Sequence, residues 1–195
     1  MSLAEALILF VPKKDRTLHL CVDYRALNKV TRKNCLALPI IGEILNCLTG
    51  ATHFTKLDLK DAYHRIPIAE QDQWKIAFRM RYGHFEYLVL LFGLTNASAI
   101  FQAYINSALS SLVDSICVVY LDDIFIYSSS REEHVRHVRV VLERFRRFGL
   151  YTNAKKYKLF CPEVDFLGFI MGQGGIWIDP ERVKMIADWP RLTSI

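Results

Sequence analysis

The chain has 195 residues, 52% of them hydrophobic and 23% charged, so it can bury a substantial core and is not a disordered polypeptide. Its net charge of +5 suits a polyanionic partner, and its five widely spaced cysteines, without zinc-ligand spacing, are typical of reduced thiols in an intracellular protein. No stretch approaches the roughly 20 apolar residues of a membrane span, and the apolar start lacks the layout of a secretion signal.

The first half of the chain is expected to contain short strands around one short helix. Pro39 is a favoured first-turn residue and Gly50 lies just past Leu48, which predicts a helix from Pro39 to Leu48. Runs of β-favouring residues predict strands at Ile8–Val11, Leu18–Val22, His53–Asp58, Ile76–Phe78 and Phe85–Val89.

The second half is expected to contain longer helices. Asn96 is a good N-cap, and apolar residues recur at helical spacing as far as Leu112. Ser130 and Glu133 form a capping box that begins another helix, which Gly149 ends. Further elements are expected near the C-terminus, namely strands near Leu159 and at Asp165–Met171 and a helix that begins at Asp179.

Two near-continuous apolar runs, Ile116–Tyr120 and Ile124–Ser128, flank Asp122 and Asp123. They predict a hairpin of buried strands with two carboxylates at its bend, which repel each other unless a cation neutralises them. An ordinary solvated turn is the alternative, but apolar flanks disfavour a long exposed hairpin. Because helices and strands mix without regular alternation, the predicted fold class is α+β.

A third carboxylate, Asp58, lies at the end of the predicted strand that begins at His53. Oxygen ligands without histidine or cysteine suit Mg²⁺ or Mn²⁺ and not zinc. Two such ions about 3.5–4 Å apart can activate an attacking oxygen and stabilise a leaving one. Asp58, Asp122 and Asp123 are therefore candidates for a two-metal phosphoryl-transfer site.

Three segments resemble known catalytic motifs in collinear order. Residues 57–64 (LDLKDAYH) resemble the first catalytic motif of reverse transcriptases, residues 92–97 (FGLTNA) the second, and residues 120–123 (YLDD) the third. The second motif lies against the template and the incoming nucleotide in that family.

Three further segments are similar to gypsy-class elements in particular: residues 21–29 (CVDYRALNK), 81–87 (RYGHFEY) and 166–168 (FLG). Over nearly its whole length the chain thus resembles the reverse transcriptase domain of a gypsy-class LTR retrotransposon, a fragment of a Pol polyprotein. The resemblance implies a right-hand polymerase palm, an antiparallel sheet with helices on one face, plus a fingers subdomain.

The resemblance also implies subdomain boundaries. Residues 1–50 would form the N-terminal part of the fingers, 51–65 the palm strand with the first motif, 66–95 an insertion between fingers and palm, 96–178 the palm with catalytic hairpin and primer grip, and 179–195 the start of the thumb. Since a palm without a complete thumb should hold primer and template poorly, weak or undetectable processive synthesis is expected from this chain alone.

The activity implied is RNA-directed DNA synthesis, which extends a primer on an RNA or DNA template with dNTPs and two Mg²⁺ ions, or Mn²⁺. Asp58 and Asp122, with the Leu59 backbone carbonyl, would ligate the metals, and Asp123 would complete the triad. Lys156 would protonate the departing pyrophosphate, although an ordinary surface lysine is the alternative.

Further residues match positions that contact nucleotide or primer. Tyr63 would crowd the 2′ position of the sugar, with a half-buried core tyrosine as the alternative. Lys13, Lys14, His19 and Phe92 would contact the nucleotide, and Phe166, Leu167 and Gly168 the primer terminus. The implied partners also include the remaining Pol domains (thumb, RNase H and integrase) of a longer precursor, in the cytoplasm within a virus-like particle or in the nucleus.

Several positions depart from the family pattern. His19 stands where an arginine normally stacks on the incoming base, and a histidine lacks the planar fork of arginine, so His19 should weaken nucleotide binding. The other departures are Leu3, Leu7, Leu91 and Ser98 for prolines, Cys35 for an arginine and Ile100 for a threonine.

Each departure is reachable by one C-to-T transition on either DNA strand. We hypothesise a copy eroded by cytosine deamination, an idea that codons without transition bias against sibling copies would refute. One alternative function is therefore an eroded, thumb-less remnant that binds nucleic acid without turnover. A palm-containing RNA polymerase or a nucleotide cyclase is a more distant alternative, which Tyr63 and the gypsy-like segments disfavour.

Overall fold

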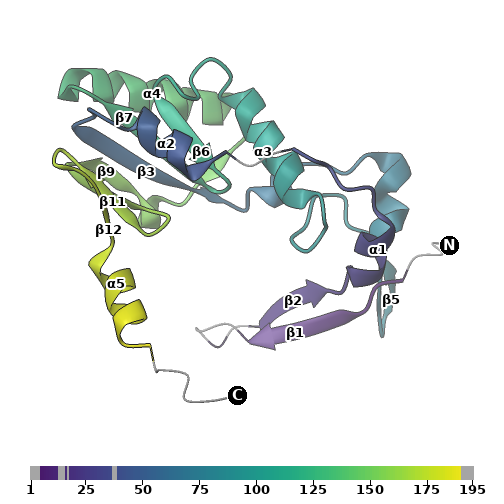
Figure 1. The fold of residues 1–195 in the computed structure, drawn as a ribbon. Helices are drawn as coiled ribbons and strands as arrows, with labels where there is room; N and C mark the ends of the chain where they lie inside the picture. Colours follow the sequence, from purple (N-terminus) through teal and green to yellow (C-terminus); the bar gives the residue numbers. More distant parts are fainter. Residues whose placement is uncertain (1–4, 13–15, 17, 37–38, 190–195) are drawn as a thin grey trace. The chain divides into compact units, whose positions relative to one another are not determined.

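The structure is a computed structural model that describes residues 5–12, 16, 18–36 and 39–189. Its contacts divide the chain into two compact units, the first formed by Met1–Leu38 with Asp61–Ile105 and the second by Pro39–Lys60 with Asn106–Ile195. Both units mix helices and strands (Figure 1), so the α+β prediction is confirmed. The assignment of segments to fingers, palm and thumb stays a prediction.

The first unit contains two antiparallel hairpins and short helical segments. Tyr24, which is buried, donates from its hydroxyl to the Ile76 carbonyl at 3.0 Å, and these two residues form a small core with Leu91. The elements are β1 (Ile8–Pro12), β2 (Leu18–Val22), α1 (Arg25–Val30), 3-10 turns at Tyr63–Arg65 and Glu70–Ile76, β4 (Phe78–Met80), β5 (Gly83–Phe85) and the start of α3 (Ala97–Ala108).

The strand pair predicted at Ile76–Phe78 and Phe85–Val89 is displaced in the structure. Ile76 ends a 3-10 turn, and β4 pairs with β5 through a tight turn in which Gly83 has φ +139°. Residues 88–90 instead pair with residues 66–68, through Ile68 N to Leu88 O at 2.9 Å and Leu90 N to Ile66 O at 2.8 Å. The predicted pairing across a turn near Gly83 is therefore present, but it is shorter than predicted, and residues 88–90 have another partner.

The second unit contains a five-stranded antiparallel sheet. Its strand order is β6-β7-β3-β8, and β9 also pairs with β3. A separate three-stranded sheet is formed by β10, β11 and β12. The elements are α2 (Ile41–Cys47), β3 (His53–Lys60), β6 (Cys117–Tyr120), β7 (Asp123–Ser128), α4 (Arg131–Arg147), β8 (Tyr151–Thr152), a 3-10 turn at Ala154–Lys156, β9 (Lys158–Cys161), β10 (Glu163–Phe166), β11 (Phe169–Gly172), β12 (Gly175–Ile178) and α5 (Pro180–Ala187).

The two faces of the five-stranded sheet pack against different elements, because side chains alternate along a strand. Thr55 of β3 faces α4, to which it is hydrogen-bonded. Its neighbour Phe54 belongs to the core on the opposite face, together with Ile44 of α2 and Val164 and Phe166 of β10. Figure 1 shows α4 running along β7, in agreement with their contacts.

The long helix α4 begins and ends where the sequence predicts. Ser130 is the N-cap, and its hydroxyl accepts a hydrogen bond from the Glu133 backbone N–H at 3.3 Å. The Glu133 carboxylate accepts from the Ser129 hydroxyl at 2.7 Å. Gly149 follows the helix with φ +65°, a left-handed conformation that glycine adopts without strain. Local capping signals therefore fix this helix.

Among the described residues, no helix is long and apolar enough to cross a bilayer.

All five cysteines lie in the described part of the chain, and none forms a disulfide.

Helix α4 places a fully buried histidine, His134, against the sheet. One ring nitrogen lies 2.8 Å from Thr55 Oγ1 and the other 2.8 Å from Ser128 Oγ. Burial, and then the neighbouring His53 and His137, lowers the pKa of His134 to about 4. The imidazole is therefore neutral at pH 7.

This buried histidine predicts that acid destabilises the second unit. In the unfolded chain the pKa of the group returns to about 6.5, so the unfolded state binds more protons than the folded state between about pH 6.5 and pH 4. The contribution to stability is complete above that window and is lost as the pH falls through it, by about 2–3 kcal/mol.

Urea unfolding at several pH values measures this effect. His134→Gln keeps neutral hydrogen-bonding groups and should flatten the decline in the free energy of unfolding, whereas His64→Gln, at an exposed site, should leave the decline unchanged. An equal decline in the parent and in His134→Gln would contradict the assignment.

Candidate active site

The structure brings the three predicted carboxylates together on neighbouring strands. In the antiparallel pairing of β3 with β7, Asp58 lies directly opposite Asp123. Such opposed residues have Cβ atoms about 4.5–5.5 Å apart. Asp122 is in the turn just before β7, where its carbonyl accepts from the Leu59 N–H at 3.1 Å. Asp58 and Asp123, far apart in sequence, thus become neighbours.

The turn between β6 and β7 holds Asp122 in an unusual environment. Leu121 has φ +53°, a left-handed conformation that branched side chains rarely adopt, so the turn is tight. Burial, then the charges of Asp58 and Asp123, raises the pKa of Asp122, and Lys156 opposes the shift. Its Oδ1 atom is buried and has no hydrogen-bond partner within the described residues. A buried carboxylate oxygen without a partner is costly and suits a cation ligand.

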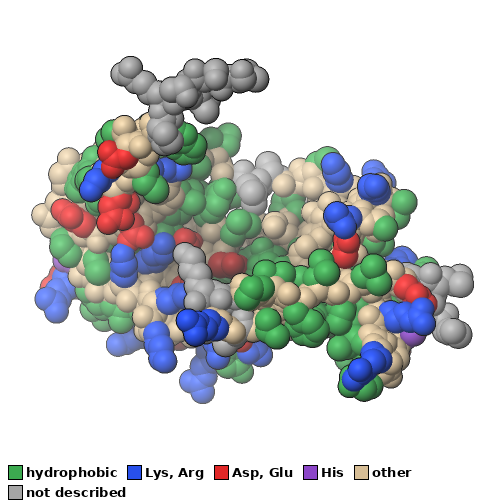
Figure 2. All heavy atoms as spheres, turned by 90° about the horizontal axis from the view of Figure 1, so that it is seen from below, with side chains coloured by type: hydrophobic (Ala, Val, Ile, Leu, Met, Phe, Trp, Pro, Cys, Tyr) green, Lys and Arg blue, Asp and Glu red, His purple; other side chains and the backbone are tan. Residues whose placement is uncertain are grey.

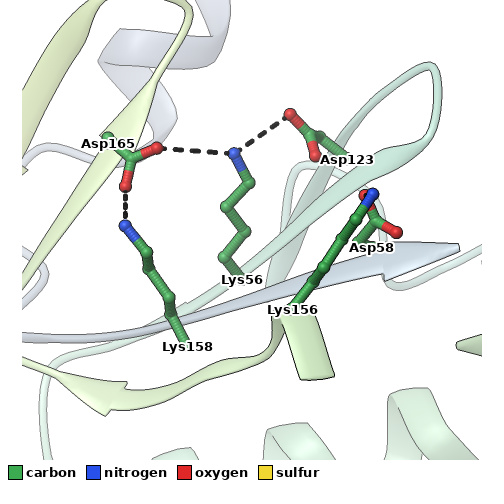
Figure 3. Close-up of polar contacts among 6 residues, drawn as sticks. All are labelled: Lys56, Asp58, Asp123, Lys156, Lys158 and Asp165. Atoms are coloured by element: carbon green, nitrogen blue, oxygen red, sulfur yellow. Dashed lines mark hydrogen bonds and ion pairs between the residues drawn. The ribbon is translucent and has the colours of Figure 1, made fainter. Parts of the chain in front are cut away.

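Two lysines approach the outer carboxylates (Figure 3). Lys156 Nζ lies 3.0 Å from Asp58 Oδ2, and Lys56 Nζ lies 3.1 Å from Asp123 Oδ2. Lys156 lies on a 3-10 turn that Asn153 anchors, since the Asn153 N–H donates to the Asp58 carbonyl at 2.9 Å. Lys156 is exposed, whereas the Lys56 side chain is only 18% exposed.

The oxygen atoms of this site suit a divalent cation, but the side chains of the described residues do not form a complete coordination site as they stand. Carboxylate and backbone carbonyl oxygens are the ligands that Mg²⁺ and Mn²⁺ prefer. Asp122 Oδ1, which has no hydrogen-bond partner within the described residues, can coordinate such a cation. Among the described residues, no three His, Cys, Asp or Glu side chains are already grouped so that they could hold a metal ion. Ion pairs to lysine hold two of the three carboxylates, so binding of a cation requires the lysines to release them or share them.

The predicted primer-contacting residues form the hairpin between β10 and β11. Phe166 is 1% exposed and its ring packs edge-on against Phe125 at 4.4 Å, so it belongs to the core. Leu167 (φ +49°) and Gly168 (φ +83°) form the turn. Arg182 of α5 donates to the Leu167 carbonyl at 2.7 Å and fills the space beside Gly168, where a Cβ atom would lie 2.0 Å from its guanidinium. The turn is therefore shaped for glycine and anchored by Arg182.

The predicted nucleotide-contacting residues of the first unit meet in part. His19 and Phe92, both exposed, line one cavity of about 360 Å³, together with Leu91. Tyr63 is 4% exposed, and its ring packs against those of Phe92 at 4.2 Å and Phe101 at 4.7 Å. This packing agrees with the alternative of a core tyrosine, and its contact with a sugar stays a prediction. Lys13 and Lys14 lie outside the described residues.

Asn28 is a structural residue of this unit to which the sequence assigned no role. Its Oδ1 accepts from the Thr95 N–H at 2.8 Å, and its Nδ2 donates to the Gly93 carbonyl at 2.7 Å. Asn96 similarly bonds the backbone of Arg32 and Asn34. Both amides hold the segment of residues 92–97 against residues 28–34. The only signal in the sequence was that Asn28 lies in the gypsy-like segment of residues 21–29.

Comparison with known proteins identifies the family. Residues 11–171 match the family model described as reverse transcriptase (RNA-dependent DNA polymerase). The chain belongs to the reverse transcriptase family. The predicted identity as a reverse transcriptase domain of the retrotransposon type is thereby confirmed.

Relatives of this reverse transcriptase domain include long transposon polyproteins. The chain is 41% identical over 182 residues to the transposon Tf2-3 and Tf2-7 polyproteins of Schizosaccharomyces pombe strain 972, which covers 93% of the chain. It spans only 14% of the length of these relatives.

Solved structures confirm the polymerase fold of the domain. The foamy viral protease-reverse transcriptase in complex with RNA/DNA hybrid is 28% identical, with a TM-score of 0.85 over 100% of this chain and 26% of that one. The same viral protein in a dRH form with double-stranded DNA is 27% identical, with a TM-score of 0.88 over 97% of this chain and 33% of that one. The predicted right-hand polymerase architecture is therefore confirmed.

Charges of both signs are present on the face of the molecule drawn in Figure 2. Acidic side chains lie there beside lysine and arginine side chains, with hydrophobic side chains between them.

Proposed function

We propose that the chain is the polymerase part of an RNA-directed DNA polymerase, which extends a primer on an RNA or DNA template by phosphoryl transfer. The observation that supports this most strongly is the pairing of Asp58 with Asp123 beside the partnerless oxygen of Asp122, in a chain of the reverse transcriptase family. The related viral enzyme has been solved with RNA/DNA hybrid and with double-stranded DNA, which are the substrates we assign here.

In this proposal Asp58, Asp122 and the Leu59 carbonyl would hold two Mg²⁺ ions, or Mn²⁺, with Asp123 completing the triad. Such ions, when bound, activate the primer 3′ hydroxyl and stabilise the charge on the leaving group. The chain's own contribution is positioning. The β3–β7 pairing holds Asp58 opposite Asp123, and the tight turn at Leu121 presents Asp122 with one buried carboxylate oxygen.

The lysines and the first unit have separate proposed roles. Lys156 would donate its proton to the departing pyrophosphate after release from the Asp58 carboxylate, and its 3.0 Å ion pair with Asp58 supports this role. His19 and Phe92 would contact the incoming dNTP in the cavity they line, and Lys13 and Lys14 its triphosphate. Leu167 and Gly168 would lie under the primer terminus. Thumb, RNase H and integrase regions are proposed to belong to the same precursor, which the 14% share of the polyprotein relatives that the chain spans supports.

A second candidate is a remnant that binds nucleic acid without turnover. It is favoured by the lysine ion pairs that hold Asp58 and Asp123, and by His19, which offers no planar fork for a phosphate.

Single-nucleotide primer extension separates the two candidates. With the chain in excess over a primed RNA or DNA template and with Mg²⁺ or Mn²⁺, we expect addition of one complementary dNTP on both templates and little addition of the rNTP. Template binding should weaken with rising salt in either case, since it depends on phosphate contacts. Salt-dependent binding without any extension would establish the second candidate and contradict the first.

A further inference from the structure

Lys56 lies at the centre of a charged network that the proposed chemistry does not use. It precedes Asp58 by two positions in β3, so the two side chains emerge on the same face of the sheet. Its ammonium lies 3.1 Å from Asp123 Oδ2 and 3.7 Å from Asp165 Oδ2 (Figure 3). One lysine thus joins a carboxylate of the catalytic hairpin to a carboxylate of β10.

The Lys56 side chain is fixed by its neighbours, unlike that of a solvated surface lysine. Its side chain is 18% exposed, and its ammonium lies 5.1 Å from the centre of the Phe125 ring, which favours a cation over its face. Phe125 is the residue directly opposite Lys56 in the β3–β7 pairing. The Lys56 side chain therefore has few alternative rotamers, because the Phe125 ring and the carboxylates of Asp123 and Asp165 surround its ammonium.

Asp165 is kept ionised at the far end of the network. The hydrogen bond from Lys158, whose position is paired with Lys56 across β9 and β3, lowers the pKa of Asp165, and the charge of Lys56 lowers it further. The next residue, Phe166, packs on Phe125. The hairpin of β10 and β11 is therefore attached to the five-stranded sheet by two neighbouring contacts, the ion pair of Asp165 with Lys56 and the packing of Phe166 on Phe125.

We propose that Lys56 is a positioning residue of the polymerase site. It holds the Asp123 carboxylate at a fixed place relative to the β10–β11 hairpin, and it competes with divalent cations for that carboxylate. The inference rests on the proposed function only for its effect on catalysis; its effect on cation binding stands without it.

Cation binding tests the proposal on the intact 195-residue chain. Mn²⁺ affinity is measured by electron paramagnetic resonance without substrate. Lys56→Met removes the competing charge but keeps the apolar stem, so Mn²⁺ should bind about 3- to 10-fold more tightly. Lys56→Arg should restore the parent affinity. In an Asp123→Asn background, the effect of Lys56→Met should shrink.

Lys75→Met is a matched control, because Lys75 also combines an ion pair, at 2.5 Å to Asp72, with an aromatic neighbour, the Trp74 ring at 5.8 Å. It should leave Mn²⁺ affinity unchanged. Parent-like or weaker Mn²⁺ binding in Lys56→Met would overturn the proposal, since a merely structural lysine would loosen the site when removed.

Kinetics add a second readout. For single-nucleotide addition, Lys56→Met should lower kcat about 10- to 100-fold with the KM for dNTP within about 3-fold, because the Asp123 carboxylate loses its fixed placement although the cation binds more tightly. Lys56→Arg should rescue kcat. Tighter Mn²⁺ binding with an unchanged kcat would refute the positioning role. If the parent chain adds no nucleotide, the proposed function fails, and the Mn²⁺ comparison alone still decides this inference.

Discussion

Replacement of Asp122 by asparagine should lower the rate of nucleotide addition about 1000-fold, which corresponds to about 4 kcal/mol of lost transition-state stabilisation. The substitution keeps the size of the side chain and removes its charge. Asp122 has the buried oxygen without a partner and a raised pKa, so its charge has no other evident task in the fold. The loss should therefore be one of catalysis.

The same variant should unfold at a higher urea concentration than the parent. A raised pKa means that the folded state disfavours the ionised carboxyl, so at pH 7 the neutral amide removes first the cost of burying a charge and then the repulsion from Asp58 and Asp123. Lower activity with higher stability is expected of a residue retained for function. Asp72→Asn, which removes an acid paired with Lys75, is the control and should leave the rate unchanged. Equal rates for Asp122→Asn and the parent would contradict the role of Asp122.

Replacement of Phe125 by alanine should destabilise the second unit by about 3–5 kcal/mol. The Phe125 side chain is fully buried, and it joins the sheet to the hairpin through Phe166. Its loss leaves a cavity in the core that Phe54 and Val164 also line, and it removes the aromatic face under Lys56. The cost should exceed that of an ordinary large-to-small change at the rim of a core.

Urea unfolding followed by far-UV circular dichroism measures this cost. Val135→Ala is the control, because Val135 lies on the outer side of α4 with 42% of its surface exposed, and it should change the free energy of unfolding by about 0.5 kcal/mol or less. A change below about 1 kcal/mol for Phe125→Ala would show that the hairpin and the sheet are not one cooperative core.

The elements that the sequence predicted correctly are those with local signals. Ser130 and Gly149 fix the ends of α4 through their own backbone bonding, and the apolar runs around Asp122 and Asp123 fix the hairpin. The displaced strand pair near Gly83 shows the limit, since residues 88–90 pair with residues 66–68 and pairing partners are not encoded in a local run of β-favouring residues.

In the candidate site, too, residues with a local signal were predicted and residues whose role depends on strand pairing were not. Asp122 and Asp123 stood out because charged residues between apolar runs are unusual in sequence, and Asp58 was chosen as a third acid at the end of a predicted strand. Lys56 did not stand out, because its role depends on the register of β3 against β7 and on a carboxylate more than 100 positions away. Phe166 was assigned to the primer by resemblance, and only the packing against Phe125 shows that its ring lies in the core.

Asp58, Asp122 and Asp123 are proposed to share divalent cations, and the parent chain and Asp122→Asn can be compared for this by titration with Mn²⁺ followed by electron paramagnetic resonance. We expect the parent to bind Mn²⁺ and Asp122→Asn to bind it at least about 10-fold more weakly, since one charged ligand is lost. Equal Mn²⁺ affinity in the two proteins would contradict this proposal.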